Sequence, residues 1–208
     1  MNVLILGAST EKSIGYHIGA HLGRQGNTVV YASRSGALGY TCDVTDVAAV
    51  TKLFENERPD LVIHAAGGAF LNTAPLGACV DWSDMAQHIA SKSFGTIVLL
   101  DAAVRIGTVK NFVMLGGRAA FGDEKMAAYV AGNGALWSLT QFANQHIASI
   151  NSFYFDMPIV IGTTNAEGLI AAGAHTASEH AQAIYVERVV EAVDNIIIGK
   201  TPQGRVVL

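Results

Sequence analysis

The sequence predicts an α/β fold with a mainly parallel sheet and helices on both of its faces. Short β-branched and aliphatic runs alternate with longer helix-like stretches, which is the order of β-α-β units. The first run, Val3 to Leu6, is hydrophobic at every position, as in a parallel strand covered on both sides. No repeat, linker or low-complexity run divides the 208 residues, so we expect one domain, residues 1–208.

The elements follow one another in a regular order. The runs rich in β-branched and aliphatic residues predict strands at Val3–Leu6, Thr28–Tyr31, Leu61–His64 and Asn111–Leu115, with further strands near Ser152–Phe155 and Arg205–Val207. The longer stretches between and after them predict helices at Ser13–Gln25, Val47–Asn56, Asp81–Val104, Ala127–Ser149 and Ser178–Ile198.

Composition excludes several functional classes. Half of the residues are hydrophobic and 14% are charged, which is typical of a compact globular protein. The net charge of -4 offers no basic surface for nucleic acid. Cys42 and Cys79 are too few for a disulfide framework and suit a reducing cytoplasm, and the histidines show no metal-ligand spacing. We therefore expect a cytoplasmic protein with no metal, no nucleic-acid partner and no membrane span.

A glycine-containing turn follows the first strand and leads directly into the first helix. Gly7 allows the chain to turn sharply, while Gly15 and Gly19 remove side chains where helix, strand and a bound pyrophosphate approach one another. The N-terminus of the helix then offers free N–H groups and a positive dipole end to the phosphates. Glycines in a glycine-rich chain also serve as simple turn residues, but this position predicts a dinucleotide site.

The chain resembles the short-chain dehydrogenase/reductase family. The spacing of Gly7, Ser13, Ile14 and Gly15 is similar to the divergent turn of the enoyl-thioester reductases in that family. The resemblance extends over nearly the whole chain. It implies a single doubly wound Rossmann domain with a central, mainly parallel sheet of about seven strands and helices on both faces.

Three further segments carry the resemblance. Asp43, after the third strand, matches the aspartate whose side chain meets the adenine amino group, and Ala65-Ala66-Gly67 matches the end of the fourth strand, with His64 in place of the usual asparagine. Pro158 and Thr163 resemble the segment that holds the nicotinamide amide, although Ile159 replaces the usual glycine. The expected cofactor-binding residues are Gly7, Ser9, Ser13, Ile14, Gly15, Ser33, Arg34, Ser35, Asp43, Val44, Ala65, Ala66, Gly67, Pro158 and Thr163.

The end of the second strand favours NADP(H) over NAD(H). NAD-binding folds place a carboxylate there to hold the ribose hydroxyls, whereas this chain has Ser33-Arg34-Ser35. The Arg34 guanidinium suits a 2′-phosphate, which a carboxylate would repel. The alternative is that Arg34 is only a solvated loop residue.

The catalytic positions that the resemblance implies are partly altered. Tyr129 stands where the family has the tyrosine that passes a proton to the carbonyl oxygen. The lysine expected four residues later is Asn133, which carries no charge to stabilise a tyrosinate. The family serine, thirteen positions before the tyrosine, falls on Gly116, so no hydroxyl is available from that residue.

A lysine occurs at the fourth catalytic position. The family has an asparagine three residues before a glycine in its fourth helix, and here Gly95 places Lys92 at that point. Asparagine and lysine have therefore exchanged places between positions 92 and 133. We hypothesise that Lys92 supplies the missing charge from the other side of Tyr129. The alternative is that Lys92 is an ordinary helix lysine.

Two functional classes remain. The first is an NADP(H)-dependent oxidoreductase acting on a small carbonyl or alcohol, with Tyr129 as proton donor. The second is a catalytically weak or silent protein that binds NADP(H) as a sensor, scaffold or regulatory subunit. The short segment Thr164–Ala177, in the family's lid region, suggests a small or weakly enclosed substrate, or none. The resemblance also implies a homodimer or homotetramer, formed by the long apolar stretches Thr96–Val104 and Ala135–Phe142.

Overall fold

A seven-stranded parallel sheet forms the centre of the molecule. The computed structural model describes residues 1–67, 82–117, 127–158, 160–163, 166–167 and 183–208. The sheet order is β3-β2-β1-β4-β5-β6-β9, and all pairings are parallel. Its strands are β1 (Asn2–Leu6), β2 (Thr28–Ser33), β3 (Tyr40–Thr41), β4 (Leu61–His64), β5 (Asn111–Gly117), β6 (Asn151–Met157) and β9 (Gly204–Val207). The predicted fold class is confirmed.

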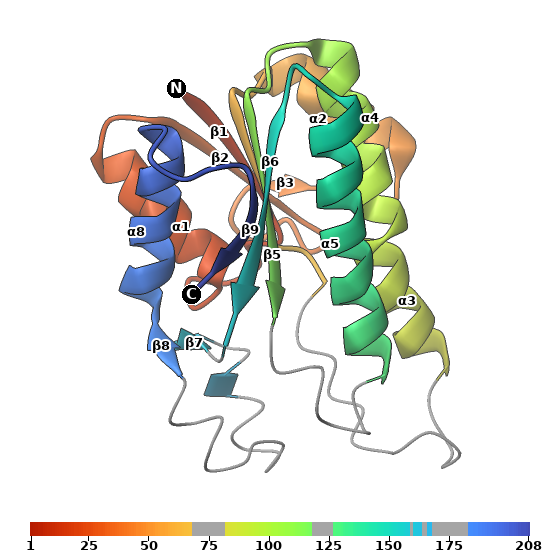
Figure 1. Ribbon diagram of the computed structural model, residues 1–208. Helices are drawn as coiled ribbons and strands as arrows, with labels where there is room; N and C mark the ends of the chain where they lie inside the picture. The colour runs from red at the N-terminus through yellow and green to blue at the C-terminus, as the bar shows by residue number, and fades with distance from the viewer. Residues whose placement is uncertain (68–81, 118–126, 159, 164–165, 168–182) are drawn as a thin grey trace.

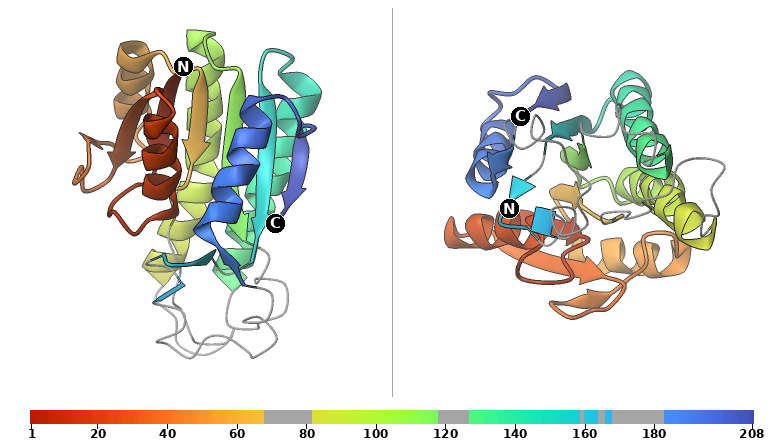
Figure 2. Two further views of the ribbon diagram at one scale, coloured as in Figure 1. Left: turned by 90° about the vertical axis from the view of Figure 1, so that its left-hand side faces the viewer. Right: turned by 90° about the horizontal axis from the view of Figure 1, so that it is seen from below.

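Helices cover both faces of this sheet (Figure 1). On one face lie α1 (Ile14–Arg24) and α8 (Val186–Ile197), and in the layer on the other lie α2 (Val47–Glu57), α3 (Trp82–Lys92), α4 (Phe94–Ile106) and α5 (Ala127–His146). The view from below in Figure 2 separates the two layers. Alternating side chains of β1 serve both cores, since Val3 and Ile5 pack with α1 and α8 whereas Leu4 and Leu6 pack with α2, α4 and α5.

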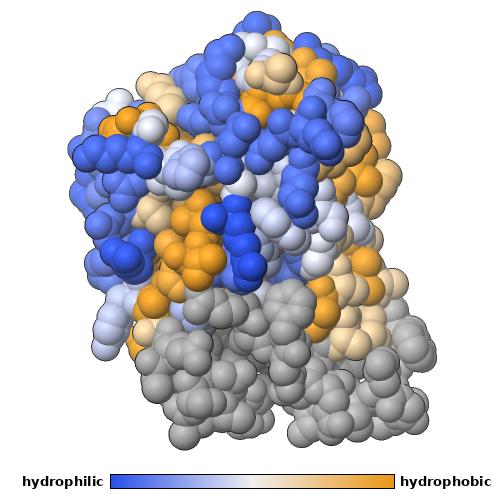
Figure 3. Space-filling model, in the orientation of Figure 1, coloured by the Kyte–Doolittle hydropathy of each residue, from blue (hydrophilic) through white to orange (hydrophobic). Residues whose placement is uncertain are grey.

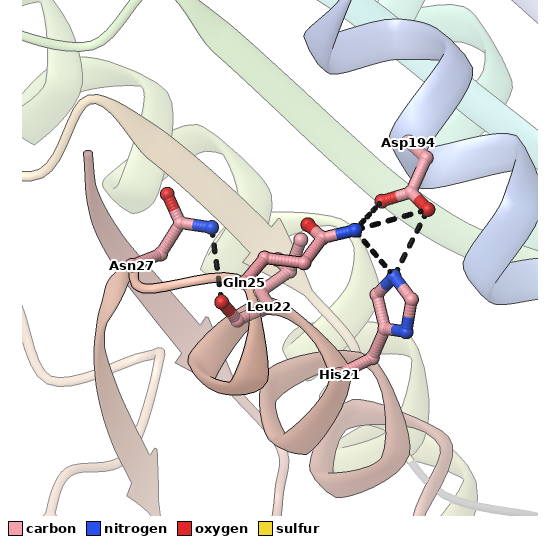
Figure 4. Close-up of polar contacts among 5 residues, drawn as sticks. All are labelled: His21, Leu22, Gln25, Asn27 and Asp194. Carbon is pink, nitrogen blue, oxygen red and sulfur yellow. Dashed lines mark hydrogen bonds and ion pairs between the residues drawn. The ribbon is translucent and has the colours of Figure 1, made fainter.

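Local contacts fix both ends of α1, the helix that follows the glycine turn. Ser13 is the N-cap of α1, because its hydroxyl accepts a hydrogen bond from Tyr16 N at 3.3 Å. At the other end of α1, His21 Nε2 lies 2.9 Å from Asp194 Oδ2 of α8, and Gln25 Nε2 donates to Asp194 Oδ1 at 3.2 Å (Figure 4). This polar cluster ties α1 to α8, so the helix that begins at the turn is held at both ends.

Three details of the predicted element order were wrong. The expected helix Asp81–Val104 is two helices, α3 and α4, separated at Ser93, whose hydroxyl donates to Ile89 O at 2.7 Å. The short pair β7 (Val160–Ile161) and β8 (Ile184–Tyr185) was not expected, and β8 occupies part of the predicted helix Ser178–Ile198. Residues 178–182 of that helix lie outside the described part. The two-residue strand β3 is too short to leave a sequence pattern.

Candidate functional site

A cavity of about 380 Å³ lies at the carboxyl ends of the central strands. Its described lining comes from the segments that follow β1, β2, β3, β4 and β6, from the end of β5, and from residues of α3 and α5. From β1 the sheet continues through β2 and β3 to one edge, whereas from β4 it continues through β5 and β6 to the other edge. The strand order therefore reverses between β1 and β4, and in doubly wound folds ligands bind at such a point. All fifteen residues expected to bind a cofactor line this cavity.

The glycine turn forms one wall of the cavity. Gly7 has φ +102°, and a Cβ on it would overlap the main chain of Ala65 and Ala66. A Cβ on Gly15 would lie 3.0 Å from the side chain of Ile5, so both glycines are required for close approach of turn, helix and strand. Because Ser13 caps α1, the first N–H groups of the helix are directed to this wall.

The Ser33-Arg34-Ser35 segment after β2 lines another part of the cavity. The hydroxyls of Ser33 and Ser35 lie 3.2 Å apart, and Ser33 Oγ also accepts from Gly36 N at 3.2 Å. Arg34 is exposed, and it forms no ion pair with any residue in the described ranges. A guanidinium in this position is free to bind a phosphate.

Two other segments line the remaining walls. Asp43 Oδ1 accepts hydrogen bonds from Thr45 N at 2.9 Å and from Thr45 Oγ1 at 2.7 Å, which fixes the loop after β3. At the opposite end, Thr163 is buried and donates to Val160 O at 2.8 Å. The described lining therefore extends from Asp43, after β3, to Pro158 and Thr163, after β6.

Tyr129 lies at the reactive end of the cavity, on the first turns of α5. A Cβ on Gly117 would overlap its hydroxyl, so the phenol rests directly against the end of β5. Its ring stacks on His88 of α3 with centroids 5.8 Å apart. Burial raises the pKa of Tyr129, hydrogen bonding by Asn133 lowers it, and the charge of Asp156 raises it further, so the phenol is protonated at neutral pH.

Asn133 is buried one helical turn beyond Tyr129. Its Nδ2 donates to Gly117 O at 3.4 Å, which joins α5 to the end of β5. The side chain does not line the cavity in the described residues. Asn133 therefore supports Tyr129 and the strand end behind it.

Lys92 reaches the same cavity from α3. Its stem passes between two glycines, since a Cβ on Gly67 would lie 2.9 Å from Lys92 Cγ and one on Gly132 would lie 2.9 Å from Lys92 Cδ. Its Nζ donates to Leu115 O at 3.3 Å. The side chain is 5% exposed, and burial lowers the pKa of Lys92 to about 8. Lys92 is therefore no ordinary helix lysine at the surface.

Two histidines beside Lys92 were not among the expected site residues. His64, at the end of β4, is 1% exposed, and His88 lies one turn before Lys92 on α3. Burial and the nearby Lys92 charge lower the pKa of each to about 3, so both are neutral at pH 7. The sequence signals were the unusual His64 before Ala65-Ala66-Gly67 and the spacing of four between His88 and Lys92.

The two glycines at the end of β5 face different tyrosines. Gly116, at the family's serine position, faces the ring of Tyr154, because a Cβ on it would lie 2.5 Å from both Cζ and Oη of that phenol. Gly117 faces Tyr129. Tyr154 was not expected beside this strand end, and it does not belong to the described lining of the cavity.

Two searches for other kinds of site returned nothing in the described residues. Groups of three or more histidine, cysteine or acidic side chains that would hold a metal ion are absent from this part of the chain. None of the helices formed by the described residues is long and apolar enough to cross a membrane.

The comparisons with known proteins agree with this geometry. Residues 3–151 match the model of the NAD dependent epimerase/dehydratase family. The chain belongs to this family. The resemblance to short-chain dehydrogenases/reductases, whose fold this family shares, is thereby confirmed. A search of curated proteins found no match.

Several solved structures share the fold of this family member. A protein from Listeria innocua aligns with 18% identity and a TM-score of 0.78, over 100% of this chain and 99% of that one. A 4-hydroxyisoleucine dehydrogenase solved with NADH aligns with 18% identity and a TM-score of 0.79, over 100% and 97%. A short-chain dehydrogenase from Burkholderia cenocepacia solved with NADP aligns with 16% identity and a TM-score of 0.77, over 99% and 87%.

Proposed function

We propose that this protein is an NADP(H)-dependent oxidoreductase that acts on a small carbonyl or alcohol. The observation that carries the proposal is that Tyr129 and the glycine turn line the same cavity. This supports a proton donor in one cavity with a helix N-terminus suited to phosphate. The neighbours solved with NADH or NADP support a nicotinamide dinucleotide as the cofactor.

The residues present fit the dinucleotide. Gly7 leaves room where a Cβ would meet the main chain, and the exposed Arg34 offers a guanidinium for the 2′-phosphate. Asp43 would hold the adenine amino group, and Pro158 and Thr163 would hold the nicotinamide amide. The hydroxyls of Ser33 and Ser35 beside Arg34 favour NADP(H) over NAD(H), because they add donors to the phosphate and no carboxylate opposes it.

The chain's own residues would then carry the proton chemistry. When bound, the reduced dinucleotide supplies a hydride for the carbonyl carbon. Tyr129 gives its phenolic proton to the carbonyl oxygen, which completes the alcohol. Lys92, buried beside the same cavity, supplies a positive charge that stabilises the tyrosinate until a proton from solvent restores the phenol. Asn133 holds the end of β5 against which Tyr129 rests.

A second candidate is a protein that binds NADP(H) as a sensor or scaffold without turnover. The observation that favours it is the raised pKa of Tyr129, which is shifted by burial, Asn133 and Asp156. Among these described groups none is a cation that would strengthen the phenol as an acid. The presence of Lys92 in the same cavity favours the enzyme over this alternative.

Consumption of NADPH over a panel of small aldehydes and ketones tests the proposal against its alternative. We expect turnover by the parent and a loss of at least about 100-fold in Tyr129→Phe, because general acid catalysis contributes about 10²–10⁴-fold. Binding of NADPH, followed by its fluorescence, is expected to be equal in both proteins. Tight binding without Tyr129-dependent turnover supports the sensor.

We further propose that the protein forms a homodimer or homotetramer through α4 and α5. Hydrophobic residues gather at the right-hand side of Figure 3, over this helical layer. Ile97 of α4 and Phe142 of α5 are each at least half exposed, at 50% and 53%. Large exposed apolar side chains in one layer are typical of an interface between subunits.

A further inference from the structure

Two phenols meet the end of β5 on consecutive residues. The hydroxyl of Tyr129 lies against Gly117, and the phenol of Tyr154 lies against Gly116. Tyr129 comes from α5 and Tyr154 from the neighbouring strand β6, where it pairs in register with Met114. The Tyr154 ring therefore leans two residues along β5 to reach Gly116, at the carboxyl end where the cavity lies.

The phenol of Tyr154 takes the volume that a side chain at position 116 would need. A Cβ on Gly116 would lie 2.5 Å from Tyr154 Oη and would overlap Cε2 of the same ring. A serine at this position is excluded while Tyr154 is present. Gly116 lines the cavity and Tyr154 does not belong to the described lining, so the phenol lies directly behind the Gly116 main chain at this point of the wall.

Neighbouring groups hold the Tyr154 phenol in this place. The ring of Trp137 in α5 packs against the Tyr154 ring with centroids 5.9 Å apart, and Tyr154 is 3% exposed. Two residues further along β6, Asp156 accepts a hydrogen bond from Arg205 Nε of β9 at 3.0 Å. Burial raises the pKa of Tyr154, and the charges of Asp156 and Tyr129 raise it further. The charge of Arg205 and a hydrogen bond with the Gly117 main chain lower it by less. The net effect is a hydroxyl that stays protonated and remains a donor.

We propose that Tyr154 is a positioning residue of the reaction centre, whose hydroxyl fixes the end of β5 against which the Tyr129 phenol rests. This inference rests on the proposed oxidoreductase function and assigns a role that spacing along the sequence does not reveal. Transfer of the Tyr129 proton requires the phenol to stay within hydrogen-bond distance of the carbonyl oxygen. A displacement of about 1 Å at such a group can cost about 10²-fold in rate.

The first test removes only the hydroxyl. Tyr154→Phe is expected to lower kcat by about 100-fold through misplacement of Tyr129, and to leave KM and NADPH binding unchanged, because the ring still fills the space beside Gly116. Tyr31→Phe is the matched control, since its hydroxyl donates to Tyr16 O at 3.5 Å within the layer of α1, and we expect parent kcat for it. Unchanged kcat in Tyr154→Phe overturns the proposal.

The second test moves the hydroxyl to the neighbouring strand. Tyr154→Ala opens the space beside Gly116, and Gly116→Ser then places a hydroxyl there. We expect this double variant to turn over at least about 10-fold faster than Gly116→Ala combined with Tyr154→Ala, which fills the space without a hydroxyl to fix the strand end. Equal rates of the two double variants mean that Tyr154 serves packing alone, and they overturn the proposal. If the double variants do not fold, the first test decides, and a parent kcat in Tyr154→Phe overturns the proposal.

The two proposals fail in different ways. If the parent itself shows no turnover over the carbonyl panel, the proposed oxidoreductase function fails and this inference fails with it. If the parent turns over and Tyr129→Phe does not, but Tyr154→Phe matches the parent, only the role of Tyr154 is overturned.

Discussion

Replacement of Lys92 by methionine is expected to stabilise the apoprotein and to abolish its turnover. Burial lowers the pKa of Lys92 from the ordinary 10.5 to about 8. At about 1.4 kcal/mol per pKa unit, the folded state disfavours the ammonium by about 3 kcal/mol. The Lys92→Met variant keeps an unbranched stem between Gly67 and Gly132 but loses the hydrogen bond to Leu115 O, worth about 1 kcal/mol. The net gain in free energy of unfolding at pH 7 is therefore about 2 kcal/mol.

The pH dependence of this gain identifies its cause. Below the folded pKa of about 8, Lys92 is protonated in both states and the whole penalty is present. Between this pH and 10.5 the unfolded chain binds more protons at Lys92 than the folded chain, so this residue makes stability rise with pH. The advantage of the methionine variant must therefore shrink through this range, and above it the lost hydrogen bond leaves the variant less stable than the parent by about 1 kcal/mol.

Other groups near Lys92 titrate elsewhere or cancel in the comparison. His64 from β4 and His88 from α3 have pKa values of about 3 and stay neutral. Tyr129 from α5 has a raised pKa, and burial raises that of Cys42 to about 11, so both make stability fall at alkaline pH. These contributions are common to parent and variant. The difference between the two proteins isolates Lys92.

Urea denaturation followed by tryptophan fluorescence, from about pH 6 to pH 10.5, measures the difference. The control is Lys52→Met on the exposed side of α2, for which we expect no pH-dependent difference from the parent. The reasoning is refuted if Lys92→Met is less stable than the parent at pH 7, or if its advantage is constant with pH. Parent-level NADPH turnover in Lys92→Met would refute the catalytic role separately.

Three further outcomes are expected. Gly7→Ala should weaken NADPH binding by at least about 10-fold and should lower the free energy of unfolding more than Gly26→Ala does. Both glycines have a positive φ, which costs another residue about 1–3 kcal/mol, but only a Cβ on Gly7 would meet neighbouring main chain. Fluorescence titration measures the binding and urea unfolding the stability, and equal effects of the two substitutions would contradict the expectation. Arg34→Glu should weaken NADPH binding by about 10-fold or more while sparing NADH, and equal loss for both cofactors would remove the NADP assignment. Ile97→Asp should shift the assembly to monomers in light scattering, and an unchanged mass would exclude the α4 surface as the interface.

The sequence predicts best those parts of the fold and site that depend on local patterns. The strand, turn and helix around Gly7 are set by short-range periodicity and glycine spacing, and the order of elements places each strand end at one edge of the sheet. The helix break at Ser93 was missed because a hydrogen bond back to Ile89 leaves no mark in apolar periodicity. The pairing of β7 with β8 was missed because such short strands lack a pattern.

Tyr154 was missed for a different reason. Its approach to Gly116 depends on the register of β6 against β5 and on the direction in which the ring leans. Neither is encoded by a fixed spacing along the chain. In the sequence, Gly116 indicates only the loss of the family's serine hydroxyl. The position of the Tyr154 phenol beside it becomes apparent only when β6 is paired with β5.

The glycines around the reactive end bear on the choice between enzyme and sensor. Gly132 lies inside α5, where glycine costs about 0.5–1 kcal/mol relative to alanine. A Cβ there would press on Lys92 Cδ at 2.9 Å and on His88 at 3.3 Å. Gly67 likewise makes room for Lys92, and Gly116 for Tyr154. Two of the three altered catalytic positions, 92 and 116, thus involve glycines that accommodate a buried polar side chain, Lys92 in the first case and Tyr154 in the second. A binding protein gains nothing from the cost of burying Lys92, so this fit favours a rearranged catalytic centre over a lost one.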